Sequence, residues 1–92
     1  MSPAAAWRVE FDAAAARDLR KLGHEPQRTI LTYLRQRIAT AEDPRRFGRP
    51  LTGDRKGLWR YRIGDYRIVA KIEDDRFVVL VVTVGHRREV YD

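Results

Sequence analysis

A Gly-Asp pair between two alternating segments restricts the fold of this chain more than any other feature. Hydrophobic residues alternate with arginines in the stretch WRYRIGDYR, residues 59–67, which is the period-two pattern of a strand with two unlike faces. Gly64 and Asp65 suit a type II′ turn, because glycine readily adopts the positive φ that its first central position requires. The sequence therefore predicts a β-hairpin in which Arg62 lies directly opposite Arg67.

This hairpin register assigns the side chains to two faces. The basic face comprises Arg60, Arg62, Arg67 and Lys71, and the hydrophobic face comprises Trp59, Tyr61, Ile63, Tyr66, Ile68 and Ile72. Like charges placed opposite each other mildly destabilise a sheet, so the pairing of Arg62 with Arg67 favours a functional role for the basic face. The alternative is an ordinary antiparallel sheet whose solvated face carries lysine and arginine.

The first half of the chain predicts one strand and two helices. Residues 7–11 alternate and indicate a strand, and Asp12 can cap a helix that ends at Gly23. A second helix is expected to begin near Pro26, because proline suits the first helical turn. Its apolar stripe comprises Ile30, Leu31, Leu34 and Ile38.

The second half predicts a basic loop and three strands. Residues 42–57 contain two prolines and three glycines and are expected to form a loop before the hairpin. Residues 77–84 are apolar at nearly every position, as in a central strand. The order β-α-α-β-β-β predicts an α+β fold in which two helices pack on one face of an antiparallel sheet, with a single domain over residues 1–92.

Composition narrows the possible partners. The 92 residues include 19 basic and 13 acidic ones, and the net charge of +6 suits an anionic partner such as nucleic acid or an acidic protein. Plain solubility is the alternative reason for this excess. The absence of cysteine excludes disulfides and thiolate chemistry, and two histidines without an acidic cluster argue against a metal site, so no cofactor is expected. The start MSPAAAW lacks the pattern of a signal peptide and no apolar run reaches membrane-spanning length, so a cytoplasmic location is expected.

The closing segment is expected to join the basic face. A two-residue turn at 74–75 would place Arg67 opposite Val82, and the last strand would then leave the sheet beside the Gly64 turn. The side chains expected to meet at that end are Arg62, Arg67, His86, Arg87 and Arg88, with Tyr91 a few residues further on.

An arginine-rich site with a histidine and a tyrosine suits phosphate, whose oxygens guanidinium groups bind in a bidentate way. RNA supplies its own nucleophile, the 2′-hydroxyl, so a ribonuclease must orient it, move protons and neutralise the phosphate. His86 is the candidate for proton transfer at neutral pH, although a surface histidine without a role is the alternative. Tyr91 can stack on a base or hydrogen-bond near the 2′-hydroxyl. The further residues expected to contact RNA phosphates are Arg60, Lys71, Arg88, Arg55, Lys56, Arg45 and Arg46.

Two segments carry a resemblance to a known family. PLTGDRKGLWRYRIGDYRIV, residues 50–69, and VVTVGHRREVYD, residues 81–92, closely resemble the RelE family of bacterial type II toxins, within the RelE/ParE superfamily. The resemblance implies a microbial-ribonuclease-like fold and a metal-independent endoribonuclease that cuts mRNA in the ribosomal A site through the 2′-hydroxyl. The family's functional positions match Arg60, Arg62, Arg67, Arg87 and Tyr91 of this sequence.

One departure from the family affects the expected mechanism. Well-known members carry lysines where this chain has Arg60 and Arg62, and one of those lysines is proposed as the general base. Arginine is a poor base, because its pKa exceeds about 12. Arg62 is therefore expected to stabilise the transition-state charge, and His86 to take the proton, with a ribosomal or solvent group as the alternative.

The resemblance also implies partners and leaves other functions open. The expected partners are a cognate RelB-like antitoxin with an acidic-leaning helical segment, the 70S ribosome and mRNA, with DNA reached only through the antitoxin complex and no membrane involved. One alternative is a ParE-like protein that inhibits DNA gyrase by binding, without catalysis. Another is a degenerate member that only binds its antitoxin and operator DNA.

Overall fold

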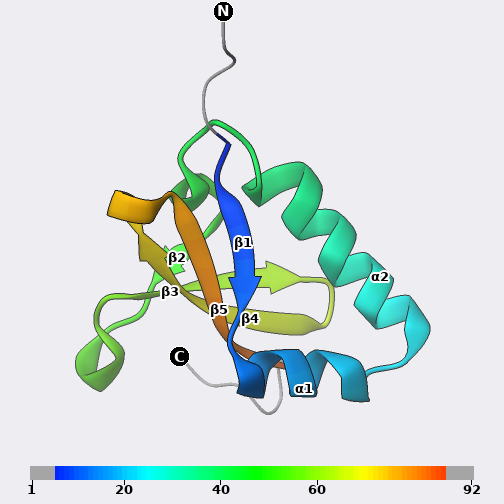
Figure 1. Ribbon diagram of the computed structural model, residues 1–92. Helices are drawn as coiled ribbons and strands as arrows, with labels where there is room; N and C mark the ends of the chain where they lie inside the picture. The colour runs from blue at the N-terminus through cyan, green and yellow to red at the C-terminus, as the bar shows by residue number, and fades with distance from the viewer. Residues whose placement is uncertain (1–5, 87–92) are drawn as a thin grey trace, which may run out of the picture.

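Five strands and two helices make up residues 6–86, the part of the chain that the computed structural model describes (Figure 1). The regular elements are β1 (Arg8–Phe11), α1 (Ala13–Lys21), α2 (His24–Tyr33), β2 (Arg49–Pro50), β3 (Leu58–Ile63), β4 (Tyr66–Glu73) and β5 (Val78–His86). A π-helical turn (Leu34–Ile38) continues α2, and 3₁₀ turns occupy Pro44–Phe47, Gly53–Arg55 and Asp74–Arg76. None of these helices is long and apolar enough to span a membrane.

The five strands form one mixed sheet in the order β1-β5-β4-β3-β2. Strands β2 to β5 pair in antiparallel fashion, whereas β1 runs parallel to β5. The expected α+β fold with two helices on one face is confirmed, but the expectation of a wholly antiparallel sheet is wrong at β1. The chain returns from β1 through both helices and three strands before it reaches β5, so no tight turn constrains the direction of that pair.

The β3–β4 hairpin has the predicted register. Arg62 pairs with Arg67, and Gly64 has a φ of 58° in the turn between them. Phe77 is the only non-glycine residue within 6–86 with a positive φ, so Asp65 keeps an ordinary backbone conformation. A positive φ at the first central position alone is the signature of the type II′ turn.

The β4–β5 register differs from the prediction. The turn is longer than two residues, because a 3₁₀ turn and Phe77, at a φ of 53°, lie between Glu73 and its partner Val78. A bulge then shifts the pairing again: Val69 pairs with Thr83 and Ala70 with Val81, which leaves Val82 as an extra residue on β5.

The bulge changes which face the end of β5 presents. Arg67 lies opposite Gly85 instead of the predicted Val82, and Tyr66 lies opposite His86. Because strand side chains alternate between faces, one extra residue moves every later side chain to the other face.

Helix α1 begins as predicted and ends differently. The Asp12 carboxylate accepts a hydrogen bond from the Ala15 N–H at 2.8 Å, the expected N-cap. Gly23 does not end α1 in a left-handed conformation; its φ is −68°, and it is the residue before α2. The Gln27 side chain instead donates to the Leu22 carbonyl at 2.7 Å, which satisfies a group just beyond α1.

The π-helical turn keeps the apolar side of α2 against the sheet. In an α-helix, residues four apart drift by about 40° around the axis, so Ile38 would turn about 80° away from Ile30. The wider turn, closed by the Ala39 N–H to the Leu34 carbonyl at 2.8 Å, offsets this drift. Ile30, Leu34 and Ile38 are all buried, whereas Leu31, also expected in the stripe, is 43% exposed.

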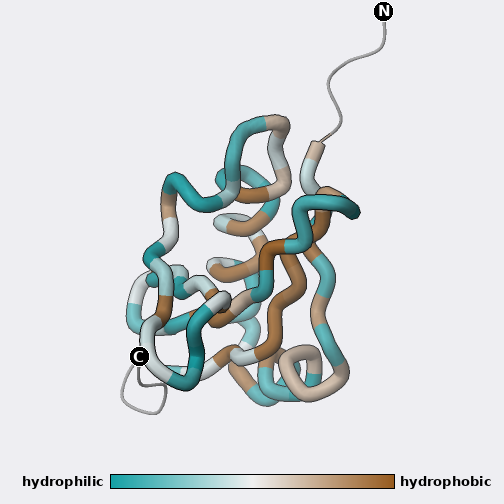
Figure 2. Tube along the Cα trace, turned by 90° about the vertical axis from the view of Figure 1, so that its left-hand side faces the viewer, coloured by the Kyte–Doolittle hydropathy of each residue, from teal (hydrophilic) through white to brown (hydrophobic). Residues whose placement is uncertain are grey.

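The core lies between the helices and one face of the sheet. It joins Ala15 and Leu19 of α1 and the buried residues of α2 to Tyr61, Ile68 and Val81 of the central strands. Figure 2 shows the hydrophobic segments gathered in the interior of the molecule, with hydrophilic segments around them. This core fixes one face of β3 and β4, and thereby leaves the alternate residues of both strands on the other face.

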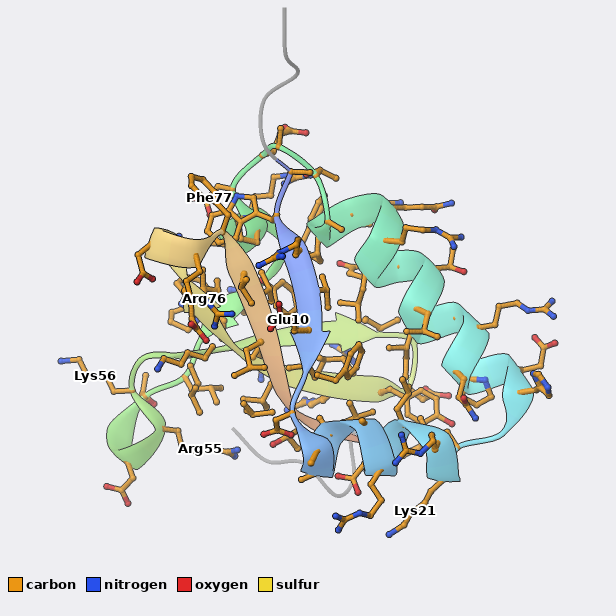
Figure 3. All side chains as sticks on the ribbon, in the orientation of Figure 1. Glu10, Lys21, Arg55, Lys56, Arg76 and Phe77 are labelled. Carbon is orange, nitrogen blue, oxygen red and sulfur yellow. The ribbon has the colours of Figure 1, made fainter. Side chains whose placement is uncertain are left out.

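Two side-chain contacts attach the β1 region to the turn before β5, beside a hydrogen bond from the Arg8 N–H to the Phe77 carbonyl at 2.9 Å. The Arg76 guanidinium lies 3.7 Å from Glu10 and 2.8 Å from Glu73, and Figure 3 shows Glu10 and Arg76 close together. The ring of Phe77 packs edge-on against Trp7, with 5.2 Å between the ring centroids.

Candidate phosphate-binding face

Four arginines occupy one region of the sheet face that the helices do not cover. We call Arg49, Arg60, Arg62 and Arg67 the arginine face. Arg62 lies opposite Arg67 on β3 and β4, and Arg49 lies opposite Arg60 on β2 and β3. The residues that alternate with Arg60, Arg62 and Arg67 pack into the core, so these arginines project from the opposite face of the sheet. Arg49 lies opposite Arg60 and shares that face.

The arginines influence one another electrostatically. Burial lowers the pKa of Arg60, and the charges of Arg67, Arg49 and Arg62 lower it further. Arginine still remains protonated at neutral pH, so the four side chains form a dense patch of positive charge. Opposed like charges cost about 0.2–1 kcal/mol per pair in a sheet, and a polyanion bound to the face would relieve that repulsion.

Arg49 was not among the predicted site residues. It lies on β2, a strand of two residues inside the segment that was expected to be a loop. The signal that could have revealed it is Gly48: a Cβ there would lie 3.0 Å from Cε1 of Tyr61 and 3.1 Å from the Arg60 carbonyl oxygen. A glycine at such a close approach indicates backbone packed directly against a neighbouring strand.

An apolar cluster covers the other half of this face. Leu51 and Val69 are buried there against Leu58 and Val82, and the Leu51 N–H donates to the Leu58 carbonyl at 2.9 Å. Lys71 pairs with Leu58 and lies beyond this cluster. Lys71 therefore lies on the same face of the sheet as the arginines, as predicted, but the apolar cluster separates it from them.

His86 does not lie on the arginine face. It pairs with Tyr66 on the helix-covered side, and the two rings meet edge-on at 5.7 Å. His86 lines a hollow of about 570 Å³ together with Asp18 and Lys21 of α1. The prediction that it would converge with Arg62 and Arg67 in one concavity is therefore wrong, because the bulge places it on the opposite side of the same sheet end.

The predicted loop residues Arg45 and Arg46 have partners within the protein. Arg45 forms ion pairs with Asp74 at 2.6 Å and with Asp43 at 3.3 Å, and its guanidinium lies 5.7 Å from the Trp59 ring. Arg46 lies 3.5 Å from Glu42, with its guanidinium 4.5 Å from the Phe47 ring. These contacts attach the loop to the rest of the fold, and neither side chain joins the arginine face.

The remaining predicted residues lie elsewhere. Arg55 and Lys56 lie on the loop before β3, at the opposite end of that strand from the Gly64 turn (Figure 3). Arg87, Arg88 and Tyr91 lie outside the described residues. Within residues 6–86, no group of three or more His, Asp or Glu side chains is placed to hold a metal ion.

Comparisons with known proteins agree with this fold. A family model described as the ParE toxin of the type II toxin–antitoxin system parDE matches residues 9–91. The toxin RelG of Mycobacterium tuberculosis is 32% identical over 84 residues, which cover 90% of this chain and 93% of RelG. The toxin RelE of the same organism is 32% identical over 85 residues, 92% of this chain and 86% of that toxin.

Solved structures give the same picture. A chain of the toxin–antitoxin complex RelBE2 from M. tuberculosis superposes with a TM-score of 0.82 and 28% identity, covering 95% of this chain and 98% of that one. The isolated E. coli RelE toxin has a TM-score of 0.67 at 23% identity, covering 87% of this chain and 83% of its own, and shares the fold. The family match and the two curated relatives, each over nine-tenths of the chain, lead to one conclusion: this chain belongs to the RelE/ParE superfamily of type II toxin–antitoxin toxins.

Proposed function

We propose that this toxin is a ribosome-dependent endoribonuclease that cuts mRNA at A-site codons and so inhibits translation and growth. The observation that carries the proposal is the arginine face, with Arg62 opposite Arg67 and Arg49 opposite Arg60. Like charges directly opposite each other destabilise a sheet, and a bound polyanion would relieve their repulsion. The names of the curated relatives, RelG and RelE, support the same branch of the superfamily.

The arginines act through charge. In the reaction, the 2′-oxygen of the RNA forms a bond to phosphorus while the bond from phosphorus to the 5′-oxygen breaks, which leaves a 2′,3′-cyclic phosphate and a 5′-hydroxyl. Negative charge accumulates on the phosphate oxygens in the transition state, where guanidinium groups stabilise it through charge-assisted hydrogen bonds. Arg62 and Arg67 hold the reacting phosphate, and Arg60 and Arg49 hold the next one.

The proton transfers need a different source. The 2′-hydroxyl must lose a proton and the leaving 5′-oxygen must gain one. The arginines hold their protons too tightly to act as bases, and His86 faces the other side of the sheet. We assign the proton transfers to water or a ribosomal group; a ribosomal group would make cleavage depend on the ribosome.

Primer extension on a defined mRNA in a purified translation system tests this function. The native protein should produce cuts within A-site codons only when ribosomes are present, and Arg62→Ala and Arg87→Ala should remove them. Arg17→Ala, an exposed arginine of α1, is the matched control and should cut like the native protein. Full cleavage by both Arg62→Ala and Arg87→Ala would refute the assigned site.

A cognate antitoxin is the proposed regulatory partner. The solved relative from M. tuberculosis is a toxin–antitoxin complex. A net charge of +6 favours rapid, salt-sensitive association with an acidic-leaning, RelB-like segment. Any contact with operator DNA would then be made through that complex.

Gyrase inhibition is the second candidate, because the matching family model is that of the ParE toxin. Such a protein would act by binding and would not cleave RNA. A supercoiling assay with purified gyrase separates the two functions: inhibition without any RNA cleavage would replace the ribonuclease proposal.

A further inference from the structure

A groove with arginines along its rim lies between α2 and the end of β3, and Tyr33 and Ile63 also line it. Its volume is about 460 Å³. Helix α2 and the π-helical turn contribute Arg28, Thr32, Gln36 and Arg37, and the hairpin contributes Arg62 and Gly64.

The groove is positively charged. Among the residues that the structure describes, no Asp or Glu lines it. Among residues 6–86, no carboxylate lies within 4.0 Å of the guanidinium groups of Arg28, Arg37 or Arg62. Threonine hydroxyls and a glutamine amide between these charges add hydrogen-bonding groups that suit phosphate and ribose oxygens.

The π-helical turn helps to build the groove. The same widening that keeps Ile38 in the core rotates Arg37 back towards the side of the helix that carries Arg28 and Thr32. The Arg37 guanidinium also lies 5.6 Å from the Phe47 ring, which itself packs edge-on against Tyr33. This contact limits the side-chain freedom of Arg37 before any ligand binds.

Arg62 connects the groove with the arginine face. It pairs with Arg67 on the sheet and also lines the groove. The positive surface therefore continues from the arginine face past Arg62 and the Gly64 turn to α2. We propose that the groove binds backbone phosphates of RNA next to the strand held by the arginine face; this inference rests on the proposed function and names the ligand that extends it.

The lining of the groove favours RNA over a peptide. Peptide segments that dock on helices are usually anchored by apolar side chains. An apolar hollow of about 310 Å³, lined by Val9, Phe11 and Leu31, is present between β1 and α2 and suits such anchors better. The α2–β3 groove has Tyr33 and Ile63 in its lining too, but it adds three arginines, which the hollow between β1 and α2 does not offer in that number.

The test compares two double variants that remove the same charge. Arg28→Gln with Arg37→Gln neutralises the groove, and Arg17→Gln with Arg20→Gln neutralises two exposed arginines of α1. The ligand is a short single-stranded RNA whose riboses are 2′-O-methylated, so that it cannot be cleaved. Fluorescence anisotropy measures its binding across a series of salt concentrations, and circular dichroism confirms that both variants are folded.

The groove variant should bind this RNA about tenfold more weakly than the α1 variant at low salt. Its slope of log K against log [salt] should be shallower by about 1.4, since each lost phosphate contact removes about 0.7 for single strands. Equal affinities and slopes for the two variants would overturn the proposal. So would failure of the native protein to bind the RNA at low salt, or intact RNA binding by a groove variant that no longer binds the antitoxin.

Sedimentation with 70S ribosomes identifies the source of the phosphates. Weaker binding of the groove variant to ribosomes without mRNA assigns the groove to ribosomal RNA, whereas weaker binding only with mRNA in the A site assigns it to the message. Both results support the proposal. Because the oligonucleotide assay needs no cleavage, a protein that never cuts mRNA but shows the groove effect would refute the proposed function alone.

Discussion

The two faces of the β3–β4 hairpin follow opposite rules. On the helix-covered face, Tyr61 and Ile68 lie opposite each other and are fully buried in the core. On the other face, Arg62 meets Arg67 and Arg49 meets Arg60. The first face packs into the core, and the second presents the positive charge that we propose meets an anionic partner. Substitutions on the first should therefore cost stability, and substitutions on the second should cost activity.

The largest effect is expected from Tyr61→Ala. Tyr61 is fully buried, and its hydroxyl donates to the Pro44 carbonyl at 2.8 Å. Removing a buried aromatic ring costs about 3–5 kcal/mol of unfolding free energy, a large part of the stability of a small domain. Urea denaturation followed by circular dichroism measures it. If Tyr61→Ala lost no more unfolding free energy than a variant of the arginine face, the two faces would not differ in their contribution to stability.

Arg62→Gln should show the reverse behaviour. Cleavage should fall by about 100-fold or more, the typical loss when a donor to a charged transition state is removed. The free energy of unfolding should stay constant or rise by about 0.2–1 kcal/mol, because the repulsion from Arg67 is relieved. Primer extension and urea denaturation on one preparation give both values, with Arg17→Gln as the control. A destabilised Arg62→Gln would mean that the arginine is part of the structural framework.

Gly48→Ala links the two faces. The new Cβ would press on the Tyr61 ring and on the Arg60 carbonyl oxygen, at 3.0 and 3.1 Å. Overpacking of this kind costs about 1–3 kcal/mol, and the displacement would move Arg49 relative to Arg60. We expect reduced stability together with weaker RNA binding, measured by urea denaturation and anisotropy. If the variant is clearly destabilised but binds RNA fully, the position of Arg49 relative to Arg60 does not matter for RNA binding.

Tyr61→Phe sharpens the account of the buried face. The ring remains, but the Pro44 carbonyl loses its donor. One lost hydrogen bond in a buried position corresponds to about 1 kcal/mol. Urea denaturation beside Tyr61→Ala separates this contribution from ring packing. A cost equal to that of Tyr61→Ala would mean that the hydrogen bond, not the ring, holds the core.

The smallest effect concerns a contact that belongs to neither face. A hydrogen bond from Arg45 holds the pKa of Asp74 below its ordinary value of 3.8. A carboxyl whose pKa is lowered on folding contributes stability above the ordinary value, and that contribution disappears as the pH falls through the folded-state pKa. Asp74 is exposed, so the change should be slight and should weaken with salt. As the pH is lowered from 5 to 2, the melting temperature of the native protein should fall slightly more steeply than that of Asp74→Asn. Parallel curves of melting temperature against pH would contradict the prediction.

The sequence predicted the hairpin register because a two-residue turn leaves little freedom. It did not predict the β4–β5 register, because a 3₁₀ turn and a left-handed Phe77 replaced the expected turn at residues 74–75. The bulge at Val82 has no distinctive local sequence, since the β-branched residues Val81 and Thr83 flank it. That single residue separated His86 from the arginines.

The other departures have the same origin in tertiary contacts. Arg49 joins the arginine face because β2 packs on β3, and the sequence alone shows only a loop rich in Gly and Pro. Arg45 finds its carboxylate on Asp74, 29 residues further along the chain, which no local pattern indicates. The alternation that places Arg60, Arg62 and Arg67 on one face was local, and it was correct.

The parallel pairing of β1 with β5 has a consequence for the order of synthesis and folding. Arg8 pairs with Val78, so the first strand to leave the ribosome finds its partner only when the last strand has emerged. Closing a loop of this length costs more conformational entropy than closing a hairpin, so the β1–β5 pair forms late. The β3–β4 hairpin joins neighbouring residues and can form early. The nascent chain can thus assemble its arginines before its sheet is closed. A protein proposed to attack the translating ribosome would therefore reach its finished fold only after β5 has left the ribosome.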